Sequence, residues 1–115
     1  MFKPFFDRLA QANPATLLIG VWGRDGLELE KCLYGTTPGN EELVGAEMAD
    51  VLSRLDSSSL AAGPSRFDYR SGEFRVLAIS LNPQFFLVVL GGPSLIPGKV
   101  ALAVELGREE LLGAL

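Results

Sequence analysis

The chain contains no histidine and only one cysteine, Cys32, among its 115 residues. Without histidine it lacks the commonest general base and the commonest metal ligand of proteins. A single cysteine cannot close an internal disulfide, and without a histidine partner it forms neither a Cys–His nucleophile nor an ordinary zinc site. We therefore interpret Cys32 as a small core or surface residue, and we expect no catalytic residue, no metal and no cofactor.

Long hydrophobic runs and clusters of positive charge are also missing. The longest apolar runs, 85–90 and 100–104, fall far short of the roughly 18 residues that a membrane span needs. Asp7 and Arg8 interrupt the apolar N-terminal stretch, which argues against a signal-peptide core. The net charge of −4 opposes binding to phosphate backbones. We expect a cytoplasmic protein that neither enters membranes nor binds nucleic acid.

What the sequence does contain is the composition of a globular domain, with 48% hydrophobic and 21% charged residues. The length is close to the commonest domain size, so we predict one domain over residues 1–115. Periodicity and turn signals predict the element order α-β-β-α-β-β-β-α. The predicted helices cover about 2–12, 42–56 and 97–115, and the predicted strands cover 16–22, 27–34, 66–70, 74–79 and 85–90.

Two of the predicted helices have distinctive ends or faces. Asn40 is placed to cap the central helix, and two glutamates follow it, where negative charge suits a helix N-terminus. The last helix directs Val100, Val104, Leu111 and Leu115 to one face. A glycine at position 107 weakens that helix by about 1 kcal/mol relative to alanine.

One segment has the setting of a phosphate-binding loop, because Gly92–Val100 follows a strand and opens a helix. Five residues separate its glycines where the motif needs four, and Val100 stands where the motif needs a hydroxyl. Two prolines also remove backbone donors. We therefore reject a nucleotide site, and we interpret the paired carboxylates at 41/42, 47/50 and 109/110 as solvated helix faces and ends.

The central helix carries the most informative pattern. Val44, Met48, Val51 and Leu55 form one stripe, which we interpret as the core face. A second seam of small or apolar residues runs beside it, and together they span an arc of roughly 160°, wider than one sheet face requires. The second seam consists of Gly45, Ala49 and Leu52. It packs either tightly on the helix's own sheet or against a second chain, and we take the second chain as the working hypothesis.

The predicted strand 66–70 carries charge on alternate positions. Arg66, Asp68 and Arg70 share one face of it. This pattern is typical of an exposed sheet surface or of an edge guarded by charge, and it also suits a salt contact with a partner.

The ordered set of elements resembles the Roadblock/dynein light-chain domain family, over nearly the whole chain. The resemblance is carried by the apolar strand 17–19 with the turn Gly23–Leu27, by the small-residue helix 43–49, and by the strand 85–90 that leads to Gly98-Lys99-Val100. The last two features look most like the bacterial MglB type. The resemblance implies an α+β fold, Roadblock- or profilin-like, with a five-stranded antiparallel sheet, the long central helix on one face and the terminal helices on the other.

The resemblance also implies a homodimer, or a heterodimer with a paralogue, in which the central helices pair and the third strands join the two sheets. On this basis we expect Met48, Leu55, Arg66, Asp68 and Arg70 at the dimer interface. MglB-type domains bind a Ras-like small GTPase and stimulate its hydrolysis without donating a catalytic arginine. The matching positions for that partner are Gly45, Ala46, Ala49 and Leu52.

Three functions follow as hypotheses. The first is a non-catalytic adaptor that regulates a small GTPase in cell polarity or motility. The second is a dimeric scaffold or light chain for a motor or signalling complex, without effect on hydrolysis. The third is a small-molecule sensor of profilin, PAS or longin type, although the sequence offers no convergent polar groups for a ligand pocket.

Overall fold

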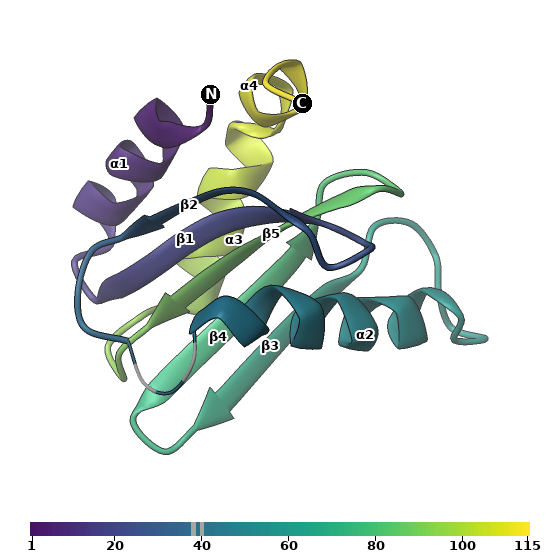
Figure 1. The fold of residues 1–115 in the computed structure, drawn as a ribbon, viewed down its shortest axis with the longest axis horizontal. Coiled ribbons are helices and arrows are strands. Elements are labelled where there is room, and N and C mark those ends of the chain that lie inside the picture. The colour runs from purple at the N-terminus through teal and green to yellow at the C-terminus, as the bar shows by residue number, and fades with distance from the viewer. Residues whose placement is uncertain (38, 40) are drawn as a thin grey trace.

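The computed structural model describes residues 1–37, 39 and 41–115. Its elements are α1 (Lys3–Ala12), β1 (Thr16–Gly23), β2 (Glu28–Leu33), a short 3₁₀ helix (Glu41–Leu43), α2 (Val44–Asp56), β3 (Arg66–Ser71), β4 (Phe74–Ser80), β5 (Phe85–Gly91), α3 (Pro97–Leu106) and α4 (Arg108–Gly113). The strands form one antiparallel sheet in the order β2-β1-β5-β4-β3. Helix α2 lies on one face, and α1 and α3 lie on the other (Figure 1). The predicted α+β fold is confirmed.

The centre of the sheet is formed by β1 and β5, which come from opposite halves of the chain. Their ladder runs from Thr16 opposite Gly91 to Gly23 opposite Phe85. Both strands are buried over nearly their whole length. This explains why each reads as a continuous apolar run rather than as an alternation, because both faces of a central strand are covered.

The sheet separates two hydrophobic layers. The larger layer lies under α1, α3 and α4 and includes the fully buried Phe6, Val100 and Leu111. The smaller layer lies under α2 alone and is built around Trp22 and Phe86, whose rings stack 6.3 Å apart. Of the helices in the described residues, α1, α3 and α4 therefore cover one face, and α2 covers the other.

The β1–β2 hairpin closes as the Asp-Gly signal predicts. Gly26 has a φ of 87°, a left-handed conformation that suits glycine. The Asp25 carboxylate accepts a hydrogen bond from the Leu27 backbone N–H at 3.0 Å, in the manner of an Asx turn. A register shift between Val21 and Trp22 shortens the pairing, so β2 begins one residue later than predicted and ends at Leu33.

The N-terminal helix α1 ends as predicted at Asn13. The Asn13 side chain donates a hydrogen bond to the Leu9 carbonyl at 2.9 Å, and Pro14 follows. Phe5, Phe6 and Leu9 are buried, which confirms the predicted apolar face.

The predicted C-terminal helix is broken into two. Helix α3 ends at Leu106, and α4 begins at Arg108. Between them, Gly107 lies so close to the Phe5 ring of α1 that a Cβ at this position would overlap it. The glycine thus admits an aromatic ring and interrupts the helix. Val100, Val104 and Leu111 are buried as predicted, but Leu115 lies past the break and is 41% exposed, so its predicted place on the buried face is wrong.

The predicted cap of the central helix, Asn40, lies outside the described residues. The 3₁₀ helix Glu41–Leu43 leads directly into α2, which ends at Asp56 as predicted. Within the described part of the chain, no helix has the length and apolar character needed to cross a membrane.

Candidate partner-binding surface

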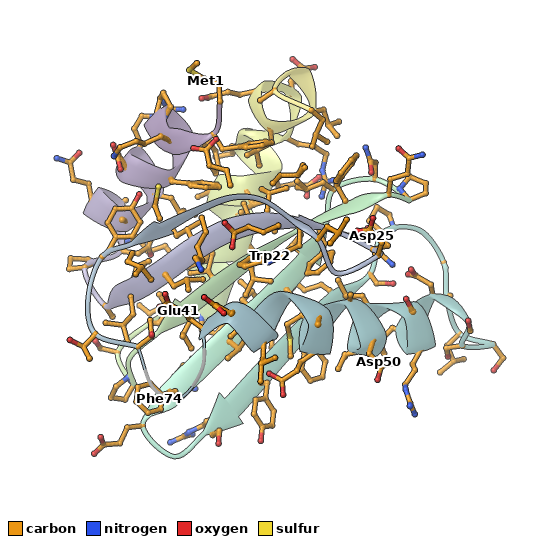
Figure 2. The ribbon with its side chains drawn as sticks, viewed as in Figure 1. Met1, Trp22, Asp25, Glu41, Asp50 and Phe74 are labelled. Carbon is orange, nitrogen blue, oxygen red and sulfur yellow. The ribbon has the colours of Figure 1, made fainter. Side chains whose placement is uncertain are left out.

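The seam of small residues on α2 faces the protein's own sheet. The indole ring of Trp22 projects from β1 toward α2 (Figure 2) and lies directly against Gly45, where a Cβ would overlap the ring. The same ring lies over Gly20 of its own strand, where a Cβ would overlap it as well. Two glycines, one on each element, thus make the space that a buried tryptophan needs.

The rest of the seam follows the same rule. Ala49 is buried and Leu52 has no exposed surface, and both belong to the layer around Trp22. This corrects the sequence interpretation, because Gly45, Ala49 and Leu52 were expected to contact a partner. They are sealed by the protomer, and of the four predicted contact residues only Ala46 is exposed.

The stripe that was predicted to be the core is only half-buried. Val44, Met48, Val51 and Leu55 all keep part of their surface accessible. Helix α2 crosses the sheet and contacts β1, β3, β4 and β5, but a helix about 10 Å wide is too narrow to cover five strands that lie about 4.8 Å apart. The seam of Gly45, Ala49 and Leu52 holds α2 over Trp22. The stripe that begins at Val44 therefore lies at the side of the helix, next to β3 and β4, and not between the helix and the sheet.

Aromatic and aliphatic side chains of β3 and β4 extend this half-buried stripe. Phe67 pairs with Ala78 and Tyr69 pairs with Val76, so all four lie on the α2 face of the sheet. The Phe67 and Tyr69 rings stack 6.1 Å apart, and Tyr69 is 50% exposed. We name as the α2–β3 surface the partly exposed residues Val44, Met48, Leu55, Phe67, Tyr69, Phe74 and Val76. It is a continuous apolar area on one side of the molecule.

Strand β3 is also an edge of the sheet. Its inner side pairs with β4, and no described strand pairs with its outer side. Arg66, Asp68 and Arg70 point to the α3 side, because Arg66 and Asp68 stand opposite Ile79 and Leu77 of the larger layer. The Arg66 guanidinium and the Asp68 carboxylate are joined at 2.7 Å. The edge is therefore apolar on one face and charged on the other.

No family model matches the sequence, and no curated protein matches it. The fold does match solved structures. The gliding protein MglB from Thermus thermophilus superposes with a TM-score of 0.79 at 13% identity, covering 93% of this chain and 82% of that one. An MglB with a tetrameric arrangement gives a TM-score of 0.81 at 13% identity, covering 95% and 83%. A Roadblock/LC7 domain from Streptomyces avermitilis gives 0.72 at 18% identity, covering 92% and 93%.

The chain has a Roadblock-type fold close to that of MglB. At these identities the likeness concerns the fold alone. It agrees with the resemblance found in the sequence.

One polar cluster anchors the far end of α2. The Arg24 guanidinium pairs with the Asp56 carboxylate and donates to the Ser80 hydroxyl at 2.8 Å. The Ser65 hydroxyl also donates to Asp56. These contacts, the Ser65 hydrogen bond most of all, hold the pKa of Asp56 below its usual value. The hairpin turn and the end of α2 are thereby tied to the end of β4.

A second polar cluster joins α1 to the end of β2. The Tyr34 hydroxyl donates to the Asp7 carboxylate at 2.7 Å, and Lys3 donates to the same group at 2.9 Å. Both hydrogen bonds lower the pKa of Asp7, and burial raises the pKa of Tyr34. Cys32, the single cysteine, is half-buried against the larger layer, as a small core residue would be.

The segment that resembles a phosphate loop serves a structural purpose. Lys99 lies in the first turn of α3, and its ammonium donates a hydrogen bond to the carbonyl of Ala12 at 2.8 Å. This hydrogen bond connects α3 to α1. Within the described residues, no three His, Cys, Asp or Glu side chains come together as a metal site.

Sequence reasoning missed Trp22 as the residue that decides the orientation of α2. The apolar surface formed by Phe67, Tyr69 and Phe74 was not predicted either. The alternation of Phe67 and Tyr69 with Arg66, Asp68 and Arg70 was the available signal, since alternate residues of a strand point to opposite faces.

Proposed function

We propose that the protein is a non-catalytic homodimeric adaptor that binds and regulates a Ras-like small GTPase, as MglB-type domains do. The observation that carries this proposal is the α2–β3 surface beside an open strand edge. A continuous apolar patch on the surface of a domain indicates an interface with another molecule. The MglB-like fold supports the choice of partner class.

In the proposed dimer, β3 of one copy pairs with β3 of the second copy around a two-fold axis. Residues that face each other across antiparallel strands point to the same side of the sheet. The two apolar faces therefore lie on the same side only if the two-fold axis passes through a residue of β3, so that this residue faces its own copy. Centring on Asp68 would place Asp68 against itself and Arg66 against Arg70, which opposes like charges. Centring on Phe67 would overlap only three residues of the strand.

Centring on Tyr69 satisfies both conditions. It overlaps positions 67–71 and sets Asp68 opposite Arg70 of the second copy on the charged face. On the apolar face it brings the two Tyr69 rings together. The charge pattern and the strand length therefore favour a dimer centred on Tyr69.

The same axis brings the two α2 helices together above the joined sheet. Met48 and Leu55 lie on the side of α2 that borders β3, so pairing would cover them. The predicted dimer residues Met48, Leu55, Arg66, Asp68 and Arg70 thus form one continuous interface in this arrangement.

The GTPase would then contact the outward rows of the paired helices. Ala46, Glu47 and Asp50 are exposed on α2. Ala46 adjoins the β1–β2 turn, since a Cβ at Gly26 would lie 3.5 Å from its Cα. Contact at Ala46 would therefore reach both α2 and the hairpin turn.

Two experiments test the proposal. Sedimentation velocity should show a dimer at micromolar concentration, and Met48→Asp or Tyr69→Asp should convert it to a folded monomer. Leu60→Asp is the matched control, because Leu60 is 88% exposed outside the surface. A monomeric wild type would overturn the dimer.

For the partner, GTP hydrolysis by a candidate Ras-like GTPase should be measured with and without the protein, and then with Ala46→Arg. Acceleration that Ala46→Arg abolishes supports the proposal. Binding without acceleration would favour the scaffold function instead, and absence of binding would reject a GTPase partner.

A further inference from the structure

A groove runs between α3 and the strands beside it, on the face opposite the α2–β3 surface. It encloses about 460 Å³, and its apolar lining includes Ile79 of β4 with Ala101 and Leu102 of α3. Arg66 of β3, Glu105 of α3 and Arg108 of α4 line it as well. The groove exists because α3 packs over the centre of the sheet and leaves the α3 side of β3 uncovered.

Helix α3 is apolar on its outward side as well as its inward side. Val100 and Val104 are fully buried against the sheet. Yet Leu102 is 60% exposed beside the groove, and Leu106, one turn later, is 81% exposed. A surface helix normally turns polar residues outward, so two exposed leucines one turn apart are typical of a helix that packs against something more.

The groove has a basic surround in an acidic protein. Arg70 and Arg75 stand directly opposite each other across β3 and β4, and like charges so placed destabilise a sheet. Arg75 donates to the carbonyl of Pro93, near the start of α3. Arg66 is paired with Asp68, and Arg108 with Glu105. The groove and its immediate surround therefore hold four arginines against two carboxylates, Asp68 and Glu105, whereas the chain as a whole has a net charge of −4.

We propose that this α3 groove is a docking site for an acidic, leucine-bearing peptide segment of another protein. A leucine side chain would enter between Ile79 and Leu102, and a flanking carboxylate would face Arg75. The inference is separate from the proposed GTPase contact, because that contact uses the opposite face of the sheet. It also holds in the proposed dimer, because Arg75, Leu102 and Ile79 are not among the residues of that interface.

The test is fluorescence anisotropy with two labelled amphipathic peptides, one of leucine and glutamate and one of leucine and lysine in the same order. The leucine–glutamate peptide should bind and the leucine–lysine peptide should not. Leu102→Asp and Arg75→Glu should each weaken binding about tenfold, which corresponds to about 1.4 kcal/mol. Leu60→Asp and Arg54→Glu are matched controls, since both residues are exposed away from the groove and should leave binding unchanged.

Several outcomes would overturn the proposal. Equal binding of both peptides, or no binding of the leucine–glutamate peptide at millimolar concentration, would show that the groove does not select acidic segments. A change of oligomeric state in Leu102→Asp would show that a second copy covers the groove. Circular dichroism of Leu102→Asp and Arg75→Glu should match the wild type, so that lost binding is not lost folding.

Discussion

The indole ring of Trp22 lies so close to Gly45 of α2 that a Cβ at this position would overlap it. Gly45→Ala should therefore destabilise the protein by about 1–3 kcal/mol, even though alanine is the better helix former. Urea unfolding measures this loss. Gly98→Ala is the matched control, because nothing lies within 4 Å of a Cβ there, and it should be neutral or slightly stabilising.

The coupling between these two residues has its own test. In a Trp22→Leu background, which is itself destabilised, Gly45→Ala should cost less than in the wild type, since the ring that opposes the added methyl is gone. Equal costs in both backgrounds would mean that the helix rather than the ring rejects the side chain.

The register of the proposed dimer predicts a charge-swap rescue. Asp68→Arg should weaken dimerisation about tenfold by placing like charges opposite each other, and Asp68→Arg with Arg70→Asp should restore it. The measurement is the dissociation constant from sedimentation equilibrium. If Arg66→Asp is the change that rescues Asp68→Arg instead, the strands pair around Phe67.

The cluster at the end of α2 predicts a pH dependence of stability. Because the pKa of Asp56 is lower in the folded protein than its ordinary value near 3.8, its contribution is complete above that value. It is lost as the pH falls through the folded pKa. Asp56→Asn should remove this acid-dependent part, about 0.2–1 kcal/mol for a partly exposed pair, in urea titrations at neutral and acid pH. Ser65→Ala should reduce it as well.

The contact between α1 and β2 predicts a measurable titration. Tyr34→Phe removes the hydrogen bond that most lowers the pKa of Asp7, so that pKa should rise. Lys3→Met should raise it too, by less. Carboxyl chemical shifts followed by NMR from neutral to acid pH report both values, and an unchanged Asp7 in Tyr34→Phe would contradict the contact.

The element order and the sheet were predictable because the strongest signals are local. The apolar run 85–90, the Asp25-Gly26 turn and the period of α1 each determine structure within a few residues of themselves. The break at Gly107 was not predictable, since it depends on Phe5, about a hundred positions earlier.

The sequence hypothesis placed the partner-binding surface on the seam of Gly45, Ala49 and Leu52, which the structure seals against the sheet. Two apolar seams lie side by side on α2, and periodicity gives no reason to choose between them. The Trp22 ring determines which seam faces the sheet, because it lies where only a glycine, Gly45, leaves room for it. A bulky residue expected in a neighbouring strand is thus the observation that distinguishes a tight internal contact from an open one.

The uneven covering of the sheet, with three helices on one face and one on the other, has a consequence for how the molecule melts. If a second copy completes the thinner layer, part of each protomer's folding free energy comes from association. The thermal midpoint should then rise with protein concentration, and dilution alone should bring unfolding to lower temperatures.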